Sequence, residues 1–222
     1  MLSWGVGKIS NLSKKRRILL FLCLSALFLI LFYAFSFIVK GGRLHSFDFD
    51  MTVRLHDKIP VKFDPYFSLL SLTGSFEITI VILILLLALK KKLFSYAVVG
   101  VFALVHVVEI LGKSFLNHPP PPFMFFRYDL GFQFPSSYVQ TGNSYPSGHA
   151  MRMMFLLIVG TWILFGIKKL KIETKYVVFA GAVLYTLLMV VSRVVLGEHW
   201  TTDVIGGSLL GTSFGFLSLI FL

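Results

Sequence analysis

Two histidines, an aspartate and two basic side chains lie at the ends of long apolar segments, where ionisable residues are uncommon. They are His149, His199, Asp203, Lys113 and Arg193. Two imidazoles with pKa values near neutrality can divide the roles of nucleophile and proton donor. Asp203 follows His199 by four residues, a spacing at which a carboxylate can hold one tautomer of the imidazole. The combination predicts phosphoryl transfer through histidine, without a metal ion.

Groups suited to binding phosphate accompany these histidines. Lys113 and Arg193 supply fixed positive charge, and Ser147, Gly148 and His149 begin an apolar segment. Backbone N–H groups at a helix N-terminus form a favourable site for an anion, so we expect these amides and the two cations to surround a phosphate. A metal site built from His, Asp and Glu is disfavoured, because the two basic side chains would repel a divalent cation.

The elements that must position these residues are membrane helices. Of the 222 residues, 56% are apolar and only 14% are charged, and the mean hydropathy is +0.83. A segment of about 18 or more apolar residues is long enough to span a bilayer. The sequence therefore predicts an all-α, polytopic membrane bundle that forms one domain over residues 1–222. Its six expected spans are residues 18–39, 67–89, 94–111, 151–167, 176–195 and 204–222.

Helical rise explains how residues far apart in the sequence can meet. Passing down one span and back up the next uses about 40 residues plus a turn, and His149 and His199 are 50 residues apart. We therefore expect both histidines, with Lys113 and Arg193, at one depth on one membrane face. Ionisable residues that converge in this way indicate a functional site.

Basic residues predict the orientation in a cell membrane. Twelve Lys and Arg residues precede the first span, join the second to the third, or join the fourth to the fifth. By the positive-inside rule these connections are cytoplasmic. Both termini are then inside, and the connections 40–66, 112–150 and 196–203, with the active site, are outside. Since these clusters hold twelve of the 21 Lys and Arg residues behind the formal net charge of +11, no nucleic-acid partner is expected.

Three further segments have a predicted structural role. The connection 40–66 has a loose amphipathic pattern that favours a short interfacial helix over a polar loop. Gly207, Gly211 and Gly215 share one helix face, which favours close packing inside the bundle, with a homodimer contact as the alternative. The loop 117–146 holds six of the eight prolines and eight aromatic residues. We expect it to cap the phosphate pocket beside the route of a lipid head group, with an aromatic interfacial belt as the alternative.

Two stretches resemble signature motifs of a known family. The stretches "SYPSGHA" (144–150) and "SRVVLGEHWTTD" (192–203) are similar to the second and third motifs of the type 2 phosphatidic acid phosphatase superfamily, which are six-span lipid phosphatases. The latter reproduces Ser-Arg, five residues, His, three residues and Asp without a gap. With Lys113 starting the first motif, the resemblance covers roughly 90 residues in signature order.

The resemblance implies a metal-independent membrane enzyme, without a cofactor, that hydrolyses a lipid phosphate or diphosphate. It implies that His199 attacks phosphorus and forms a phosphohistidine, that Asp203 orients His199, and that His149 protonates the leaving group. The residues that would hold the phosphate oxygens are Lys113, Ser147, Gly148 and Arg193.

The first motif departs from the family pattern. In the family, Arg-Pro follows the lysine after six residues, whereas this register reads Pro120-Pro121. His118 and Arg127 are the candidates to replace the missing arginine. We favour Arg127, because a guanidinium fork matches the geometry of a phosphate. The alternative is an ion pair of Arg127 with Asp129 that only shapes the loop.

The residues leave the substrate and the reaction partly open. Phosphatidic acid, phosphatidylglycerol phosphate, a polyprenyl diphosphate and a lipid A phosphate all present an anion at the membrane surface. A phosphohistidine can also be attacked by an acceptor alcohol, so the alternative enzyme is a lipid phosphotransferase. The altered first motif leaves an inactive lipid-binding or transport protein as the alternative outside enzymes.

Overall fold

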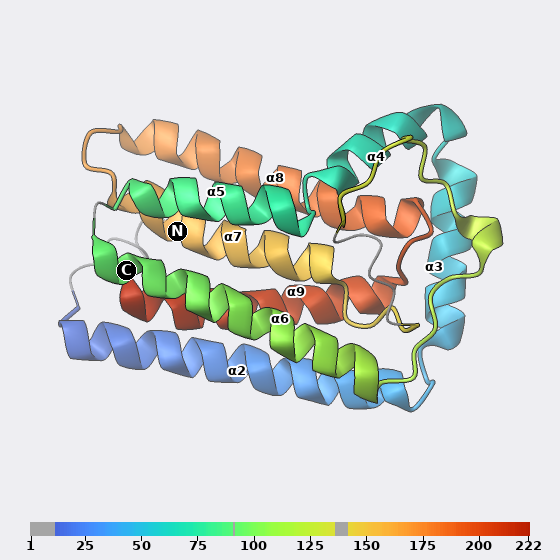
Figure 1. Cartoon of the computed structure of the whole chain (residues 1–222), viewed down its shortest axis with the longest axis horizontal. Coiled ribbons are helices and arrows are strands. Elements are labelled where there is room, and N and C mark those ends of the chain that lie inside the picture. Colours follow the sequence, from blue (N-terminus) through green and yellow to red (C-terminus); the bar gives the residue numbers. More distant parts are fainter. Residues whose placement is uncertain (1–11, 91, 136–141) are drawn as a thin grey trace.

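The structure, a computed structural model, describes residues 12–90, 92–135 and 142–222, and the regular elements within these ranges are all helices (Figure 1). In chain order they are α2 (Lys14–Lys40), α3 (His45–Lys58), η1 (Val61–Phe63), α4 (Asp64–Leu72), α5 (Phe76–Ala88), η2 (Leu93–Tyr96), α6 (Ala97–Phe115), η3 (Phe123–Phe125), α7 (Gly148–Gly166), α8 (Ile172–Val195), α9 (Thr201–Ser218) and η5 (Leu219–Phe221). This confirms the predicted all-α class.

The helices account for the six predicted membrane spans, with one modification. Within the described ranges, five helical segments are long and apolar enough to cross a bilayer, and a sixth span results if the bent pair of α4 and α5 counts as one. The pair bends by 51°, so the residues of the second predicted span form two helices joined at a bend. The break lies at residues 73–75, where Thr73 Oγ1 donates to the carbonyl of Leu70 at 2.6 Å. The chain is a multi-pass membrane protein.

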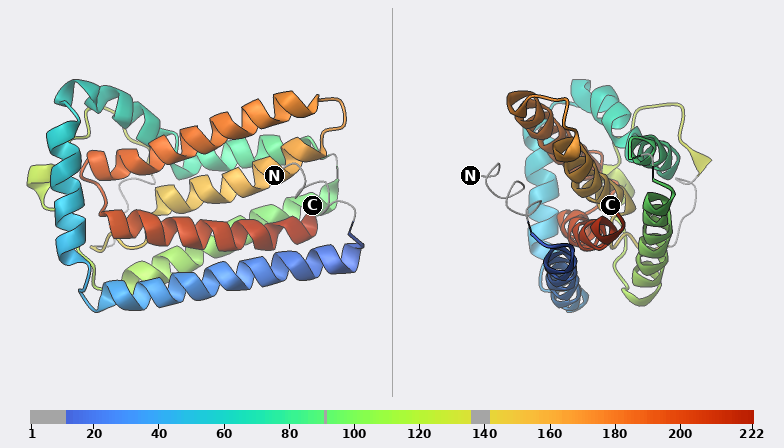
Figure 2. Two further views of the ribbon diagram at one scale, coloured as in Figure 1. Left: turned by 180° about the vertical axis from the view of Figure 1, so that it is seen from behind. Right: turned by 90° about the vertical axis from the view of Figure 1, so that its left-hand side faces the viewer.

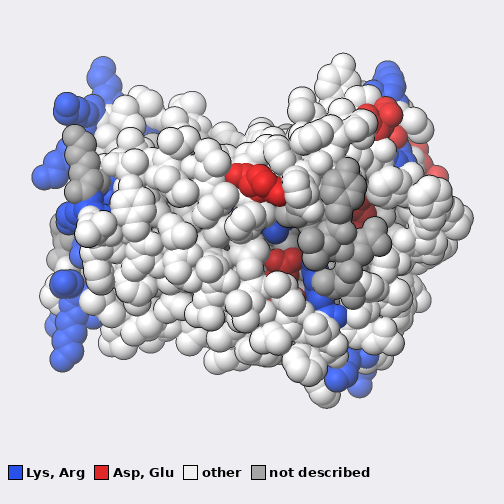
Figure 3. Space-filling view, in the orientation of Figure 1, with Lys and Arg blue, Asp and Glu red and all other residues white. Residues whose placement is uncertain are grey.

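The two ends of the bundle differ in structure and charge. Helix α3 lies across one end of the bundle, transverse to the long helices, as expected for the connection 40–66 (Figure 1). A band of Lys and Arg covers the opposite end, whereas the α3 end mixes both signs (Figure 3). Lys8 and Lys91, two of the twelve clustered basic residues, lie outside the described residues. The basic end of the bundle is the end that the positive-inside rule predicted to be cytoplasmic.

Helix α9 is the central helix of the bundle, next to α2 and α7 (Figure 2). A Cβ atom at Gly207 would lie 2.2 Å from the carbonyl oxygen of Ser147, and one at Gly211 would lie 2.1 Å from that of Met151. A Cβ atom at Gly215 would lie 2.9 Å from the side chain of Ile158 in α7. The glycine face is therefore covered by α7. The prediction of packing inside the bundle is confirmed, and a homodimer contact through this face is ruled out because the face is buried.

Candidate active site

A cavity of about 600 Å³ lies at the α3 end of the bundle. A hollow with acidic and basic atoms inside it opens on the face shown in Figure 3. Helices α6, α7 and α8, the α8–α9 connection and the proline-rich loop all contribute to the lining. The charged and imidazole side chains that line it are Glu109, Lys113, His149, Arg152, Arg193, Glu198 and His199.

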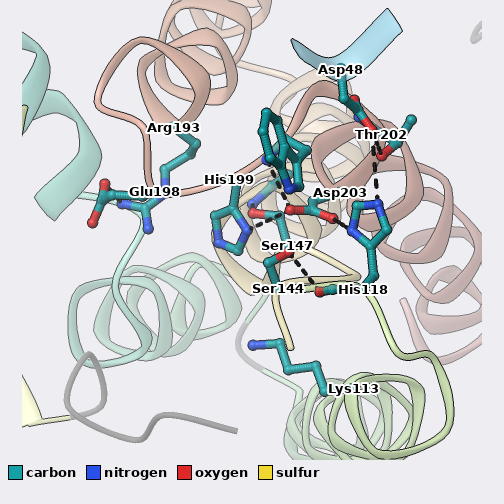
Figure 4. Close-up of polar contacts among 12 residues, drawn as sticks. Asp48, Lys113, His118, Ser144, Ser147, Arg193, Glu198, His199, Thr202 and Asp203 are labelled. Carbon is teal, nitrogen blue, oxygen red and sulfur yellow. Dashed lines mark hydrogen bonds and ion pairs between the residues drawn. The ribbon is translucent and has the colours of Figure 1, made fainter. Parts of the chain in front are cut away.

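His199 lies in the α8–α9 connection, one turn before Asp203 (Figure 4). Its Nδ1 is 3.3 Å from Oδ2 of Asp203, and the same oxygen accepts a hydrogen bond of 2.9 Å from the backbone N–H of Trp200. Asp203 is fully buried and His199 is 8% exposed. Burial lowers the pKa of His199 to about 4, although the bond to Asp203 acts to raise it. His199 is therefore a neutral imidazole near pH 7, with Nδ1 directed at the carboxylate.

The second carboxylate oxygen of Asp203 has a different partner. Nδ1 of His118 lies 2.9 Å from Oδ1 of Asp203 (Figure 4). His118 does not line the cavity. The prediction that His118 binds phosphate is therefore not supported, because its ring is directed at Asp203.

His149 lies in the first turn of α7 and lines the cavity opposite the break between α4 and α5. Nη2 of Arg152 is 3.2 Å from Nδ1 of His149, and Nε of Arg152 donates to the carbonyl oxygen of Gly74 at 2.8 Å. That carbonyl is accessible because the chain leaves the helical path at Gly74. A Cβ atom at Gly74 would lie 3.0 Å from the His149 ring, so the glycine also gives the imidazole its space.

Each of the two predicted cations has a carboxylate partner. Lys113 Nζ is 2.9 Å from Oε1 of Glu109, which lies one helical turn earlier on α6. Arg193 is 2.5 Å from Glu198 and also donates to the hydroxyl of Ser71 in α4. Burial raises the pKa of Glu198, although Arg193 and a hydrogen bond from Ser71 oppose this shift. Both cations are therefore paired with carboxylates of the cavity wall. The negative charge of a bound phosphate could take the place of these carboxylates.

The start of α7 supplies fewer phosphate donors than the sequence suggested. The N–H of Ser147 donates to the carbonyl oxygen of Asp203 at 3.0 Å, and the Ser147 side chain caps α7 through the N–H of Ala150. Ser147 is fully buried and does not line the cavity. Its predicted role is therefore corrected to that of a structural cap. Gly148 and His149 line the cavity and keep the expected position at the helix start.

Gly148 also explains how closely α6 approaches α7. A Cβ atom at this position would lie 2.2 Å from Oε1 of Glu109 and 3.0 Å from Nη1 of Arg152. The carboxylate and the guanidinium therefore flank the same face of the glycine. Any side chain there would separate Glu109 from the start of α7.

The structure corrects the prediction for Arg127. Its Nε and Nη2 donate to both carboxylate oxygens of Asp64, at 2.9 and 2.6 Å, and Nη2 also donates to the carbonyl of Ile59. Arg127 does not line the cavity. The alternative ion pair with Asp129 is wrong as well, since the partner is Asp64 at the start of α4. Arg127 thus ties the loop to α4.

Arg152 is the cavity-lining cation that the sequence analysis missed. It is 7% exposed and belongs to α7. A signal was present, because an arginine inside an apolar membrane segment marks a functional position, and it follows His149 by three residues. The cavity wall therefore holds a third cation beside Lys113 and Arg193, a guanidinium that α7 supplies.

The proline-rich loop lines the cavity, as predicted. Pro120, Pro121, Phe123 and Phe126 contribute to its wall, although Tyr138 lies outside the described residues. The loop contacts the α8–α9 connection at Gly197, which has a φ of +65°. A Cβ atom at Gly197 would lie 1.9 Å from the carbonyl oxygen of Phe125, so only glycine permits this approach.

Known proteins resemble this chain in sequence and in fold. An undecaprenyl-diphosphatase of Sulfolobus acidocaldarius is 40% identical over 79 residues, which are 36% of this chain and 34% of that protein. The match thus spans about a third of the relative's length. The crystal structure of a transmembrane PAP2-type phosphatidylglycerolphosphate phosphatase from Bacillus subtilis has a TM-score of 0.73 at 20% identity, and covers 88% of this chain and 94% of that one.

A second solved structure shares the fold. The LpxE protein of Aquifex aeolicus has a TM-score of 0.56 at 23% identity, and covers 78% of this chain and 94% of that one. A family profile described as the PAP2 superfamily matches residues 75–222. This range is about two thirds of the chain and includes every charged and imidazole residue of the cavity wall. The chain therefore belongs to the PAP2 superfamily.

Proposed function

We propose that the protein is a membrane phosphatase that hydrolyses a lipid phosphate or diphosphate through a phosphohistidine on His199, at the extracytoplasmic face and without a metal ion. The observation that carries this proposal is the convergence of two histidines and three cations on one cavity. The altered first motif does not argue for an inactive protein, because Arg152 restores a third cation.

The first step forms a bond from Nε2 of His199 to phosphorus and breaks the bond from phosphorus to the leaving oxygen. Nδ1 of His199 is directed at Asp203, so Nε2 is the nitrogen that can attack. The carboxylate stabilises the positive charge that develops on the ring. The leaving oxygen takes the bonding pair, and a protonated His149 supplies its proton.

The second step reverses these roles. A water molecule attacks the phosphohistidine, the P–N bond breaks, and its electron pair returns to Nε2 of His199. His149, now neutral, accepts the proton of the water. Lys113, Arg152, Arg193 and the amides at the start of α7 hold the phosphate oxygens, where negative charge increases in the transition state. These fixed cations take the place that a metal ion would have in other phosphatases.

The purified, detergent-solubilised protein provides the test. We expect phosphate release, in excess EDTA, from at least one of phosphatidic acid, phosphatidylglycerol phosphate, undecaprenyl diphosphate and a lipid A phosphate. His199→Ala should abolish release and the acid-labile label on the protein. The control is His106→Ala in α6, whose Nδ1 contacts the carbonyl of Phe102 and whose side chain does not line the cavity. A label on His149, or activity that needs an added divalent ion, would contradict the proposal.

The orientation is tested separately by thiol labelling. In a Cys23→Ala background, Gly131→Cys in the proline-rich loop should react with a membrane-impermeant maleimide in intact cells. Lys169→Cys, in the α7–α8 connection, should react only after lysis. Both positions are exposed, so the difference reports the membrane side. The opposite pattern would place the site on the cytoplasmic face.

A further inference from the structure

Asp203 has an imidazole at each of its carboxylate oxygens. Oδ2 contacts Nδ1 of His199 at 3.3 Å, and Oδ1 contacts Nδ1 of His118 at 2.9 Å (Figure 4). His118 comes from the segment that follows α6, and it is 4% exposed. The nucleophile is therefore linked, through one carboxylate, to a second histidine outside the cavity wall.

His118 is held by its backbone and by its ring. Its N–H donates to Oδ1 of Asn143 at 3.0 Å, and its carbonyl accepts from the N–H of Ser144 at 2.9 Å and from the Ser144 hydroxyl at 3.1 Å. The ring stacks on His45, with centroids 5.8 Å apart, and packs edge-on against Tyr145. These contacts hold the ring in place, with Nδ1 beside Oδ1 of Asp203.

The other ring nitrogen of His118 faces a second buried carboxylate. Nε2 lies 3.8 Å from Oδ2 of Asp48 in α3. Asp48 in turn accepts from the backbone N–H and the hydroxyl of Thr202, at 2.8 and 2.6 Å. Burial raises the pKa of Asp48. A continuous path of polar contacts thus runs from α3 through His118 and Asp203 to His199.

We propose that His118 is a positioning residue for the nucleophile, which holds the Asp203 carboxylate in the orientation that directs Nε2 of His199 at phosphorus. The inference rests on the proposed phosphohistidine mechanism. A carboxylate with a single partner can turn about its Cβ–Cγ bond, whereas contacts at both oxygens restrict it. A fixed Oδ2 in turn restricts the ring of His199, because Nδ1 of that ring is hydrogen-bonded to Oδ2.

The proposal predicts which kinetic step depends on His118. A small displacement of a nucleophile lowers the rate of bond formation steeply, and His118 does not line the cavity. Loss of His118 should therefore slow the formation of phosphohistidine, by roughly 10- to 100-fold, and leave KM nearly unchanged. A residue that held phosphate would alter KM or the affinity for inorganic phosphate instead.

Three substitutions separate the contact with Asp203 from the volume of the ring. His118→Asn places its amide nitrogen near the position of Nδ1 and can still donate to Asp203. His118→Gln places its amide nearer the position of Nε2, and His118→Phe keeps a ring without a donor. We expect the Asn variant to retain most of the rate and the Gln and Phe variants to lose it. The control is His56→Phe in α3, a half-buried ring that packs on Phe125 outside the cavity.

The pH dependence gives a readout that a purely structural role would not move. Asp203, Arg193, Lys113 and His149 are the charged and titratable groups that act on His199 from α9, α8, α6 and α7. Removing the His118 imidazole takes away the nitrogen that lies 2.9 Å from Oδ1 of Asp203, so the carboxylate becomes more basic and attracts a protonated His199 more strongly. The pKa of His199 should rise in the Phe variant, and the acid limb of phosphohistidine formation should shift to higher pH.

The experiment follows phosphohistidine by rapid quench of the full-length protein with a fluorogenic aryl phosphate, together with Tm for each variant. Wild-type rates in the Gln and Phe variants would overturn the inference. An equal loss in all three variants, with an unshifted acid limb and lowered Tm, would overturn it as well and make His118 structural. If wild-type protein forms no phosphohistidine, the proposed function fails and the inference fails with it.

Discussion

Nη2 of Arg152 lies 3.2 Å from Nδ1 of His149, one helical turn earlier on α7. A guanidinium can only donate, so Nδ1 is the acceptor and the proton of a neutral His149 ring is on Nε2. When His149 is protonated on both nitrogens, as a proton donor must be, this hydrogen bond cannot form. The guanidinium of Arg152 can then donate its hydrogen bond to a phosphate bound in the cavity.

Arg152→Gln should therefore lower kcat/KM about a hundredfold, because losing a positioned donor to a transition-state oxyanion costs on the order of 3 kcal/mol. Arg152→Lys keeps the charge but loses the fork, and should recover only part of the activity. Steady-state kinetics with a lipid phosphate in detergent measures both, with Arg43→Gln at an exposed position of the α2–α3 connection as the control. Near-normal kcat/KM in Arg152→Gln would assign the third cation a structural role.

The nucleophile should remain active well below neutral pH. A nucleophilic imidazole must be unprotonated, and the pKa of His199 is lowered to about 4. The activity due to His199 is therefore present above this value and is lost as the pH falls through it. An aryl phosphate with a good leaving group, which needs no proton donor, isolates this step in a profile of kcat/KM from pH 3.5 to 8. A midpoint near 6.5, the ordinary value for histidine, would show that the His199 ring is not desolvated.

The glycine face of α9 should tolerate no side chain. Gly207→Ala and Gly211→Ala would each place a methyl group within about 2.2 Å of a carbonyl oxygen of the α7 segment, so α7 would have to move and carry His149 with it. We expect a Tm lower by several degrees, on the order of 2 kcal/mol, and a loss of activity. Gly181→Ala in α8 is the matched control, since it has open space around it. Equal Tm values for the three variants would contradict the packing described above.

The positions of His149, His199 and Asp203 could be predicted from the sequence, because helical rise and span length return distant residues to one membrane face. The contacts of Arg152, His118 and Arg127 could not. Each of the three makes at least one contact with a partner that no local pattern identifies, such as the carbonyl of Gly74 at a helix break or a carboxylate 63 residues away. The break between α4 and α5 could not be predicted either, because residues 67–89 form one apolar run in the sequence.

Arg127 gives the prediction that most directly separates the structure from the sequence-based expectation. Its guanidinium binds both oxygens of Asp64, a carboxylate that is 3% exposed. Its backbone N–H donates to the carbonyl of Leu196 at 2.9 Å, so the side chain and the backbone connect the loop to two different helices. A substrate phosphate would have to displace Asp64 to reach Arg127, and would leave that carboxylate buried without its partner.

Arg127→Met should therefore destabilise the protein by about 3 kcal/mol, because removing one partner leaves a buried charge uncompensated, while kcat/KM of the folded fraction changes less than about threefold. The double variant Arg127→Met with Asp64→Leu removes both charges and should be less destabilised than the sum of the two single variants. Thermal unfolding in detergent and steady-state assays below Tm measure the two quantities on the same samples. The opposite result, a hundredfold loss of kcat/KM with an unchanged Tm, would return Arg127 to the phosphate site and require Asp64 to release it when substrate binds.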